Sequence, residues 1–311
     1  MKYDLYFHND FDGRASAAVF LDFLKKRGGS VENYFQVDHW IGDKWDALVK
    51  KSKNSVAVFD FYFHPKATFF FDHHATTFKK KIWEKDFKSN RFYNLDPKYK
   101  SCCKLVFDAL KKNFGYQSGA HIKDLVKWAE IVDDADYPSP RLTIEVKEPA
   151  LEIDAFIDER STKENLSWLI KLMSRKPLQE IARLRKIQKV VKTVRGKIKR
   201  GLSFTIKNMQ IFGKVTFLDL SLTNMPRVRF APHFLYPKLS YAVTLMKDVD
   251  GFRIAVGGNP WRKQVCRIDL GRYAKSKYGG GGHRRAAGIT KIRSRKDGLR
   301  IARELIEFLN K

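Results

Sequence analysis

The sequence has 311 residues, enough for about two domains that each bury a substantial core. Lysine and arginine number 61 against 34 acidic residues, which gives a formal net charge of +27. Hydrophobic residues make up 43% of the chain and aromatic residues 14%, and these fractions exclude a disordered basic tail, which cannot bury enough apolar surface to fold.

The first half of the chain alternates predicted strands and helices. Short β-prone or apolar runs predict strands, and segments rich in helix formers predict helices. The predicted strands cover residues 2–7, 55–61 and 67–71, and the predicted helices cover residues 15–27, 101–114 and 121–132. Because such alternation requires parallel strands joined by crossover helices, the sequence predicts an α/β fold with a doubly wound, mainly parallel sheet.

The second half begins with a long helical segment. Residues 162–199 have a helical pattern almost throughout, with Pro177 as a break or a new start. Several β-like runs follow in residues 202–260, and an amphipathic helix is predicted over residues 296–309. We therefore predict three parts: a first domain over residues 1–145, a helical connector over residues 146–200, and a smaller mixed α/β domain over residues 201–311.

The positive charge lies almost entirely in the second half. Residues 1–145 carry 24 basic and 20 acidic side chains, whereas residues 146–311 carry 37 and 14. The excess is strongest in residues 170–200, where twelve basic residues accompany one acidic residue, Glu180. This asymmetry indicates a basic half that attracts a polyanion, and the alternative for residues 170–200 is a solvated helix face.

The cysteines and the N-terminus bear on the compartment. The three cysteines, Cys102, Cys103 and Cys266, are too few for a disulfide framework, so a reducing compartment is expected. Charged residues from Asp4 onwards interrupt the apolar core that a signal peptide needs, and no stretch approaches the apolar length of a membrane span. We therefore expect a cytoplasmic protein without a membrane partner.

Carboxylates and histidines are predicted to gather at one edge of the first sheet. His8, Asp10 and Asp12 follow the first strand at alternate positions, which share one face in extended geometry. Asp60 lies at the end of the second predicted strand, and Asp-His-His at residues 72–74 ends the third. Because the carboxyl ends of parallel strands meet at one edge of a sheet, we expect these groups to converge. Each motif taken alone could have a purely structural role, as a turn or an acidic surface loop. Such a role explains much less readily why all of them end predicted strands of the same domain.

Such a cluster needs cations, because several carboxylates within a few ångströms repel one another or become protonated. Carboxylates with one or two imidazoles suit Mn²⁺ or Mg²⁺ first. Enough ligands exist for two ions with Asp60 between them, an arrangement typical of hydrolysis at phosphorus. Asp133, Asp134 and Asp136 follow a predicted helix and could complete the cluster. Structural or surface roles are expected for the histidines outside these motifs, His39, His64 and His121.

Five short segments stand out by their order and spacing over almost the whole chain. They are HNDFDG at 8–13, FDF at 59–61, FDHH at 71–74, EIVDDAD at 130–136 and GGGGHRRAAG at 279–288. Together they resemble the motifs of the DHH phosphoesterases that carry the DHH-associated C-terminal domain. The first motif is more similar to RecJ-like and nanoRNase-type members than to type II pyrophosphatases. The resemblance implies an active site in the cleft between a DHH domain and a smaller substrate-binding domain.

The resemblance implies two divalent metal ions, with Mn²⁺ expected first and Mg²⁺ or Co²⁺ as alternatives. The implied ligands are His8 and Asp10 for one ion, Asp12, His73 and Asp133 for the other, and Asp60 as the bridge. In the fourth motif Asp133 is the expected ligand, because it follows two apolar residues as the family's aspartate does. Asp134 and Asp136 are the alternative ligands. His74 is expected to contact the scissile phosphate or orient the nucleophile. The implied catalytic residues are therefore His74, Asp60 and Asp12.

The resemblance also implies that the second domain binds the substrate, through glycine N–H groups that approach a phosphate and through neighbouring cations. The implied residues are Gly280, Gly281, Gly282, His283, Arg284 and Arg285. Where relatives use an Arg-Ser pair to bind the nucleotide, this chain has Asn259, followed by Trp261. Asn259 is expected to take that contact and Trp261 to stack on a base. The alternative is a turn at Asn259 and a packing role for Trp261.

These features lead to three hypotheses about function. The first is a metal-dependent phosphodiesterase that degrades short oligonucleotides or single-stranded RNA or DNA from an end and releases nucleoside monophosphates. The second keeps this chemistry with a small nucleotide, such as a cyclic or linear dinucleotide or adenosine 3′,5′-bisphosphate. The third is a non-catalytic nucleic-acid-binding protein, which the presence of every expected ligand disfavours. Polarity, substrate length and oligomeric state stay open, with a homodimer among the alternatives.

Overall fold

A computed structural model describes the backbone of residues 1–311 and every side chain except that of Lys263. The chain forms two compact units. Unit 1 consists of residues 1–136 and 147–191, and unit 2 consists of residues 137–146 and 192–311. The sequence-based division into functional parts at residues 145 and 200 stays a prediction.

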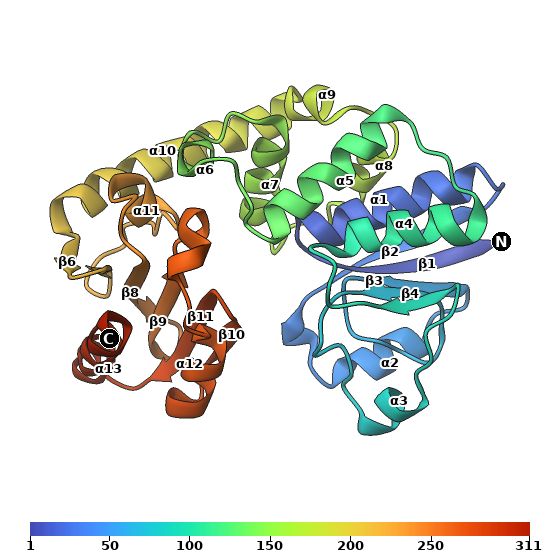
Figure 1. Cartoon of the computed structure of the whole chain (residues 1–311). Coiled ribbons are helices and arrows are strands. Elements are labelled where there is room, and N and C mark those ends of the chain that lie inside the picture. The colour runs from blue at the N-terminus through green and yellow to red at the C-terminus, as the bar shows by residue number, and fades with distance from the viewer. The chain divides into compact units, whose positions relative to one another are not determined.

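Unit 1 is built on a five-stranded parallel sheet with the strand order β2-β1-β3-β4-β5. The strands are β1 (Lys2–His8), β2 (Ser30–Val37), β3 (Ser55–Phe59), β4 (Ala67–Asp72) and β5 (Tyr93–Leu95). One side of the sheet carries α1 (Phe11–Lys25), α4 (Cys102–Phe114) and α5 (Ala120–Asp133), and the other carries α2 (Lys44–Lys50) and α3 (Lys81–Asp86) (Figure 1). The predicted doubly wound α/β sheet is confirmed.

Aromatic side chains fill the core on both faces of this sheet. Between the sheet and α1, the ring centroid of Phe20 lies 4.8 Å from that of Phe59 and 5.0 Å from that of Phe69. On the other face, Trp45 of α2 packs edge-on against Tyr6 of β1, with 5.5 Å between the ring centroids. Each fully buried ring of this size stabilises the fold by about 1.5–3 kcal/mol. The loops at the carboxyl ends of the strands are therefore attached to a rigid scaffold.

Four more helices follow in the chain: α7 (Pro149–Arg160), α8 (Ser167–Met173), α9 (Leu178–Ala182) and α10 (Arg185–Asn208). Pro177 directly precedes α9, at the position where the sequence predicts a break or a new helix start. Helix α10 runs from unit 1 into unit 2, because the boundary between the units falls after Val191. It contains nine lysines and arginines and no acidic residue.

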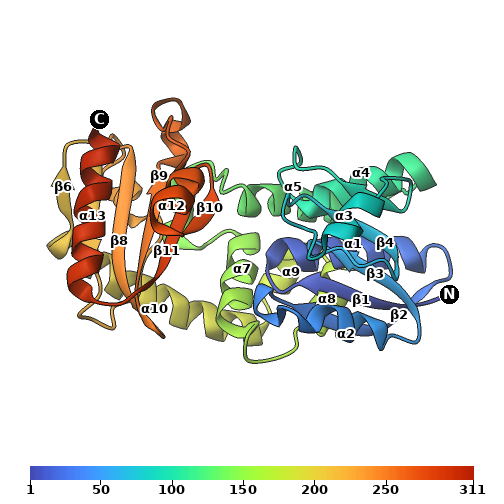
Figure 2. The ribbon, with the colours of Figure 1, turned by 90° about the horizontal axis from the view of Figure 1, so that it is seen from below.

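Unit 2 contains a six-stranded mixed sheet with the order β10-β11-β9-β8-β7-β6, in which β7 and β8 are parallel and the other pairs antiparallel. The strands are β6 (Gln210–Phe212), β7 (Val215–Asp219), β8 (Tyr241–Asp248), β9 (Gly251–Gly258), β10 (Gly281–His283) and β11 (Ala286–Ile292). Helices α12 (Leu270–Tyr278) and α13 (Arg295–Asn310) lie on the same face of this sheet (Figure 2). The short helices are α6 (Pro140–Glu145) and α11 (Ala231–Leu235). The prediction of a second, mixed α/β domain is confirmed.

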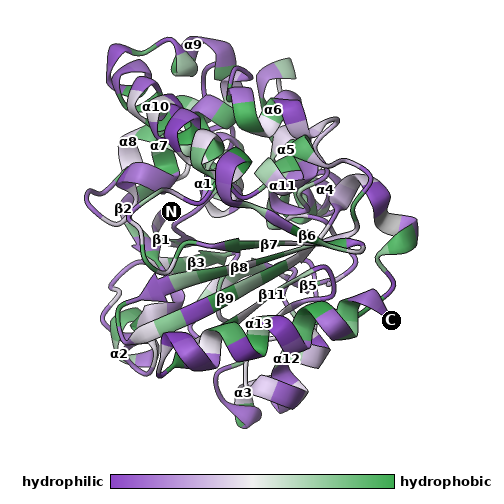
Figure 3. Cartoon of the chain, turned by 90° about the vertical axis from the view of Figure 1, so that its left-hand side faces the viewer, coloured by the Kyte–Doolittle hydropathy of each residue, from purple (hydrophilic) through white to green (hydrophobic). Residues whose placement is uncertain are grey.

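The amphipathic pattern of α13 explains how unit 2 closes its core. Ile301, Leu305 and Leu309 recur at a spacing of four residues and are buried against the sheet. Figure 3 shows hydrophobic and hydrophilic residues interspersed along this helix. Among the described residues, no helix combines the length and the hydropathy needed to cross a membrane.

Candidate metal centre

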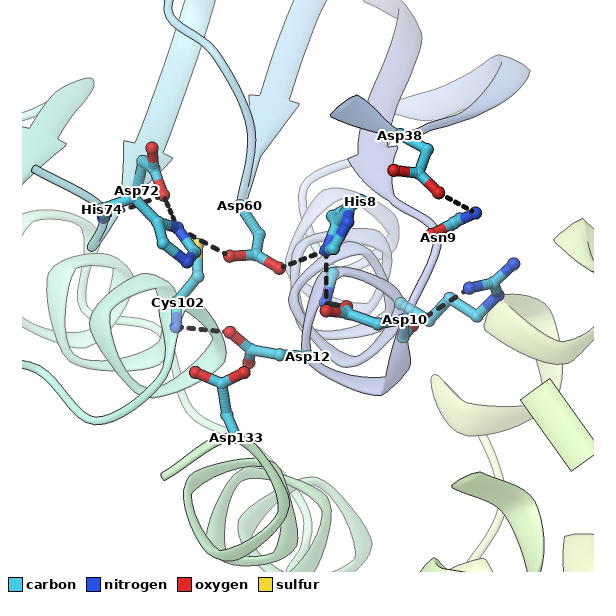
Figure 4. Close-up of polar contacts among 12 residues, drawn as sticks. His8, Asn9, Asp10, Asp12, Asp38, Asp60, Asp72, His74, Cys102 and Asp133 are labelled. Atoms are coloured by element: carbon cyan, nitrogen blue, oxygen red, sulfur yellow. Dashed lines mark hydrogen bonds and ion pairs between the residues drawn. The ribbon is translucent and has the colours of Figure 1, made fainter. Parts of the chain in front are cut away.

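The candidate site lies at the carboxyl ends of β1, β3 and β4, all in unit 1 (Figure 4). His8 is the last residue of β1, Asp60 directly follows β3, and His73 and His74 directly follow β4. Asp133, the last residue of α5, reaches the same place. The parallel sheet thus brings side chains that are far apart in the sequence to one edge.

A tight turn from β1 into α1 positions the first motif. Asp10 caps α1, because its Oδ1 accepts the N–H of Gly13 at 2.9 Å, and its Oδ2 lies 2.6 Å from Nδ1 of His8. Gly13 is needed here, since a Cβ would lie 2.3 Å from the carbonyl oxygen of His8. The capping bond therefore holds Asp10 against His8.

Asp12 lies in the first turn of α1 and is held by the start of a second helix. Its carboxylate accepts the backbone N–H of Cys102 at 2.6 Å and of Cys103 at 3.0 Å, the first two residues of α4. A helix N-terminus favours a negative group at this position. Burial and the neighbouring carboxylate of Asp60 nevertheless raise the pKa of Asp12 well above its ordinary value. Asp12 is fixed in place, and a cation beside it would favour its ionised form.

Three sets of side chains bring metal-binding atoms within 4.8 Å of one another. They are His8, Asp10 and Asp60; Asp12, His73 and Asp133; and Asp60, His73 and His74. Oδ2 of Asp60 lies 3.7 Å from Nδ1 of His8, and its Oδ1 lies 3.6 Å from Nε2 of His73. Nε2 of His73 in turn lies 3.3 Å from Oδ2 of Asp133. Asp60 is therefore a member of the first set that also lies beside His73 of the second.

Three buried atoms of this cluster have no hydrogen-bond partner among the described residues, namely both carboxylate oxygens of Asp60 and Nε2 of His73. Leaving a buried polar group unpaired costs about 1–3 kcal/mol, so nearly all such groups have a partner. Asp60 also has a φ of 57°, a conformation that costs a non-glycine residue about 1–3 kcal/mol and clusters at functional sites. A divalent cation beside Asp60 would satisfy these atoms, so the residues fit the metal ions that the motifs imply.

The charges of the cluster are strongly coupled. Burial disfavours the imidazolium form of His8 and His73, but nearby carboxylates, chiefly Asp10 and Asp60 respectively, raise their pKa values to about 11 and about 10. Burial disfavours ionisation of Asp60, yet His73 and His8 lower its pKa. Burial and the charge of Asp60 raise the pKa of Asp133 to about 7. Protons and a divalent cation thus compete for the same lone pairs, and metal binding would release protons.

Asp72, the first residue of the Asp-His-His motif, positions the two histidines. Its Oδ1 accepts the backbone N–H of His73 at 2.8 Å and of His74 at 3.2 Å, and lies 2.8 Å from Nδ1 of His74. Asp72 is buried, so this network is shielded from water. The sequence predicts that Asp72 lies with the paired histidines at the end of a strand, but that it positions them appears only in the structure.

The structure separates the three aspartates of the fourth motif. Asp133 faces His73 in the cluster, as described above. Asp136 accepts a hydrogen bond from Lys100 at 2.7 Å, and Asp134 lies 3.7 Å from the same ammonium group. Asp133 is therefore the one placed among the other candidate ligands.

The glycine-rich fifth motif lies in unit 2 and forms the hairpin of β10 and β11. A Cβ at Gly280 would lie 2.4 Å from the carbonyl oxygen of Gly288, and one at Gly282, whose φ is +139°, would lie 2.3 Å from that of Ala286. Close backbone packing thus requires these two glycines. Gly281 has open space around it. The turn that follows β10 carries Arg284 and Arg285, with His283 as the last strand residue.

Asn259 and Trp261 are engaged within unit 2. Asn259 is only 1% exposed, and its side-chain amide donates to the carbonyls of Pro237 at 3.1 Å and Leu239 at 2.9 Å. Its Oδ1 accepts the backbone N–H of Trp261, whose indole N–H donates to the carbonyl of Tyr137 at 2.7 Å. These bonds favour the alternative in which Asn259 forms a turn and Trp261 packs.

His39, for which only a structural or surface role was expected, lies beside the cluster. The centroid of its ring is 5.1 Å from that of His8 and 5.6 Å from that of Phe61. His39 follows β2, which pairs in parallel with β1. The position of His39 after a strand could have indicated a place at the site. The segment SVENYFQV was not predicted as β2, however, because polar residues interrupt its β-prone residues.

Comparisons with known proteins bear on the fold. No protein-family model matches the sequence, and a search of curated proteins finds no match. Among solved structures, the pGpG-specific phosphodiesterase PggH from Vibrio cholerae matches with a TM-score of 0.73 and 18% identity, over 99% of this chain and 99% of that chain. RecJ from Thermus thermophilus in complex with Mn²⁺ matches with a TM-score of 0.58 and 14% identity, over 99% of this chain but only 52% of RecJ.

An exopolyphosphatase-related protein from Bacteroides fragilis also matches, with a TM-score of 0.54 and 12% identity, over 100% of this chain and 94% of that protein. At these identities the likeness shows the fold. The chain has the fold of these phosphoesterase-like proteins, and its resemblance to the DHH phosphoesterases with the DHH-associated domain is confirmed at the level of the fold.

Proposed function

We propose that this protein is a divalent-metal-dependent phosphodiesterase that hydrolyses short oligonucleotides or single-stranded nucleic acid from an end and releases nucleoside monophosphates. The observation that carries the proposal is the pair of candidate metal-binding sets at the sheet edge, together with the buried carboxylate of Asp60, which belongs to one set, lies 3.6 Å from His73 of the other and has no hydrogen-bond partner among the described residues. Paired metal sites of this kind serve in-line hydrolysis at phosphorus.

Each candidate ligand has an assigned place in this proposal. One ion would be held by His8 and Asp10, the other by Asp12, His73 and Asp133, and Asp60 would serve both. Two bound divalent cations, Mn²⁺ first, would activate a water molecule and stabilise the negative charge that develops on the phosphate.

His74 is suited to contact the scissile phosphate. Its Nδ1 is held by Asp72 at 2.8 Å, so the orientation of the ring is fixed. Burial disfavours the imidazolium form, but Asp72 and Asp60 raise the pKa of His74. The side chain is 32% exposed, so a phosphate can approach it. A protonated His74 would donate a hydrogen bond to a phosphate oxygen, and the aspartates Asp60 and Asp12 would complete the catalytic set.

Substrate capture is assigned to the basic second half of the chain. The hairpin of unit 2 offers the open Gly281 and the side chains of His283, Arg284 and Arg285, while Gly280 and Gly282 shape its backbone. Helix α10 adds nine cations, and each phosphate that they neutralise would add affinity by counterion release. Asn259 is left out of this set because its amide is already fully bonded.

A linear dinucleotide is the second candidate substrate. The match to the pGpG-specific phosphodiesterase spans 99% of both chains, whereas this chain spans only about half of RecJ. A chain of this length therefore suffices, in a similar fold, for a substrate of two nucleotides. The same cluster would perform the chemistry, and only the length of the captured strand would differ.

A substrate panel tests the proposal and separates the two candidates. Purified protein with Mn²⁺ is incubated with a linear dinucleotide, a cyclic dinucleotide, a long single-stranded RNA and the matching DNA, and the products are separated by chromatography. Stepwise release of mononucleotides from the long strand would support the first candidate, and cleavage of the linear dinucleotide alone would support the second. The proposal fails if no substrate is cleaved. Raising the salt concentration should weaken cleavage of the long strand more than that of the dinucleotide if α10 binds phosphates.

A further inference from the structure

We propose that His39 binds the substrate, by donating a hydrogen bond from Nε2 to the phosphate held at the set of His8, Asp10 and Asp60. This inference rests on the proposed phosphodiesterase function and adds a residue to its site. His39 begins a single turn, η1 (His39–Ile41), one residue after the end of β2, the neighbour of the strand that ends at His8.

The position of His39 is fixed by packing. Its ring stacks on Phe61 with 5.6 Å between centroids and an interplanar angle of 23°. Phe61 itself stacks beside His8, with 6.2 Å between the centroids of their rings. The two imidazoles are thus held side by side, 5.1 Å apart. A phosphate bound at His8 would lie within reach of a second imidazole held this close.

The backbone of the turn is also fixed. Oδ1 of Asp38 accepts the backbone N–H of His39, and its Oδ2 accepts the side-chain amide of Asn9 at 3.2 Å. Figure 4 shows this Asn9–Asp38 pair next to His8. Since Asn9 lies between the two motif residues His8 and Asp10, the turn that carries His39 is tied to the first motif itself.

A hydrogen bond to Tyr62 occupies Nδ1 of His39 and leaves Nε2 as the ring nitrogen that can face a ligand. The hydroxyl of Tyr62 lies 2.9 Å from Nδ1 of His39, and burial raises the pKa of this phenol, so the hydroxyl keeps its hydrogen. When that hydroxyl donates to Nδ1, the neutral ring carries its hydrogen on Nε2. Nε2 is then a hydrogen-bond donor.

Nε2 of His39 is available for a ligand. It has no hydrogen-bond partner among the residues that the structure describes, and His39 is exposed. The ammonium group of Lys79 lies 4.5 Å from the ring centroid of Tyr62, on the residue whose hydroxyl contacts His39. The residue after His39, Trp40, is 79% exposed, so this turn is open to solvent. An open donor suits an anionic phosphate oxygen.

The test compares His39→Ala, His39→Gln and His39→Asn on a linear dinucleotide with Mn²⁺. The matched control is His121→Ala, which removes an imidazole elsewhere in unit 1. We expect His39→Ala to lower kcat/KM by about ten- to a hundredfold, the range for a hydrogen bond to a charged group. The amide nitrogen of glutamine takes the place of Nε2, so His39→Gln should recover most of the loss. Asparagine does not reach this position, so His39→Asn should not recover it.

A second readout separates a contact with the phosphate from a structural effect. Sulfur replaces one or the other non-bridging oxygen in the Rp and Sp phosphorothioate dinucleotides. The ratio of the two rates should change in His39→Ala and stay as in the wild type in His121→Ala. The affinity for Mn²⁺, measured by titration calorimetry, should be the same in all variants.

Three results separate the possibilities. A wild-type protein that cleaves no substrate of the panel overturns the proposed function. An active wild type with His39→Ala within about twofold of it in kcat/KM, a change too small for a lost charged hydrogen bond, overturns the inference about His39 alone. A fall in Mn²⁺ affinity in His39→Ala also overturns it, because the ring would then act through the metal ion.

Discussion

The two units use their motif residues in different ways. In unit 1, polar atoms of the motifs face one another at the edge of a sheet, and both carboxylate oxygens of Asp60 and Nε2 of His73 have no hydrogen-bond partner among the described residues. In unit 2, Gly280 and Gly282 allow close backbone packing, and every polar group of the Asn259 side chain is bonded. The unsatisfied atoms of Asp60 and His73 indicate a ligand site, whereas the satisfied amide of Asn259 and the tightly packed glycines indicate a role in folding.

The two halves of the chain also differ in their balance of charged side chains. Residues 1–145 are close to balance, with 24 basic and 20 acidic side chains, whereas residues 146–311 have 37 and 14. The acidic side chains of the first half include the candidate metal-binding sets, whose charge cations would offset. The excess of cations in the second half would attract a polyanion. The variants below test this division, beginning with the largest expected effect.

Asp60→Asn should remove the activity. The change takes one negative charge from the position between the two metal-binding sets, and we expect kcat/KM to fall by about a thousandfold or more, the upper range for loss of one charge-stabilising group. The matched control is Asp124→Asn, on the exposed side of α5. Circular dichroism would verify the fold of both variants. Full activity of Asp60→Asn would contradict the assignment of the site.

Gly282→Ala should destabilise the protein, whereas Gly281→Ala should not. A Cβ at Gly282 meets a backbone oxygen at 2.3 Å and stands on a residue with φ of +139°, so we expect a loss of about 3 kcal/mol in the stability of unit 2. Gly281 has open space, and its variant should stay within about 0.5 kcal/mol. Calorimetric melting curves would measure both. Equal melting temperatures would refute the packing explanation of this motif.

Much of the fold could be predicted from the sequence. Apolar runs predicted β3 and β4, and helix formers with clear stops predicted α1, α4 and α5. Strands β2 and β5 were not predicted, because exposed polar residues, Ser30, Glu32 and Asn33, interrupt the β-prone residues of β2, and β5 has only three residues. Both take their place in the sheet by pairing with a stronger strand, which no local pattern reveals.

The candidate site was predictable where its residues end strong strands. His8, Asp60 and the paired histidines carry this signal themselves. The roles of Asp72 and His39 depend on neighbours that only the folded chain supplies: the backbone N–H groups after β4 for Asp72, and the ring of His8 for His39. Sequence reasoning could name these residues but could not place them.

Asp72→Asn should reduce the activity without removing it. The variant keeps an acceptor for the backbone N–H groups but loses the charge that raises the pKa of His74. We expect kcat to fall by about tenfold, as for partners that orient metal-site residues, and the alkaline limb of the pH–rate profile to move to lower pH. An unchanged profile would argue against a protonated His74 as the donor.

The stability of the protein freed of metal by EDTA should fall as the pH rises from 7 to 9. The folded pKa values of His8, about 11, and His73, about 10, lie above the unfolded value of 6.5. Their stabilising contribution is complete below that value and is lost as the pH approaches the folded pKa values. Mn²⁺ competes with these protons, so the rise in melting temperature that it causes should grow over the same range. A rise that shrinks with pH would contradict this account.

Anomalous diffraction from crystals grown with Mn²⁺ tests the central claim most directly. We predict two anomalous peaks in unit 1, one among His8, Asp10 and Asp60 and the other among Asp12, His73, Asp133 and Asp60. Mn²⁺ bound only elsewhere, or no peak at the carboxyl edge of the parallel sheet, would contradict the account.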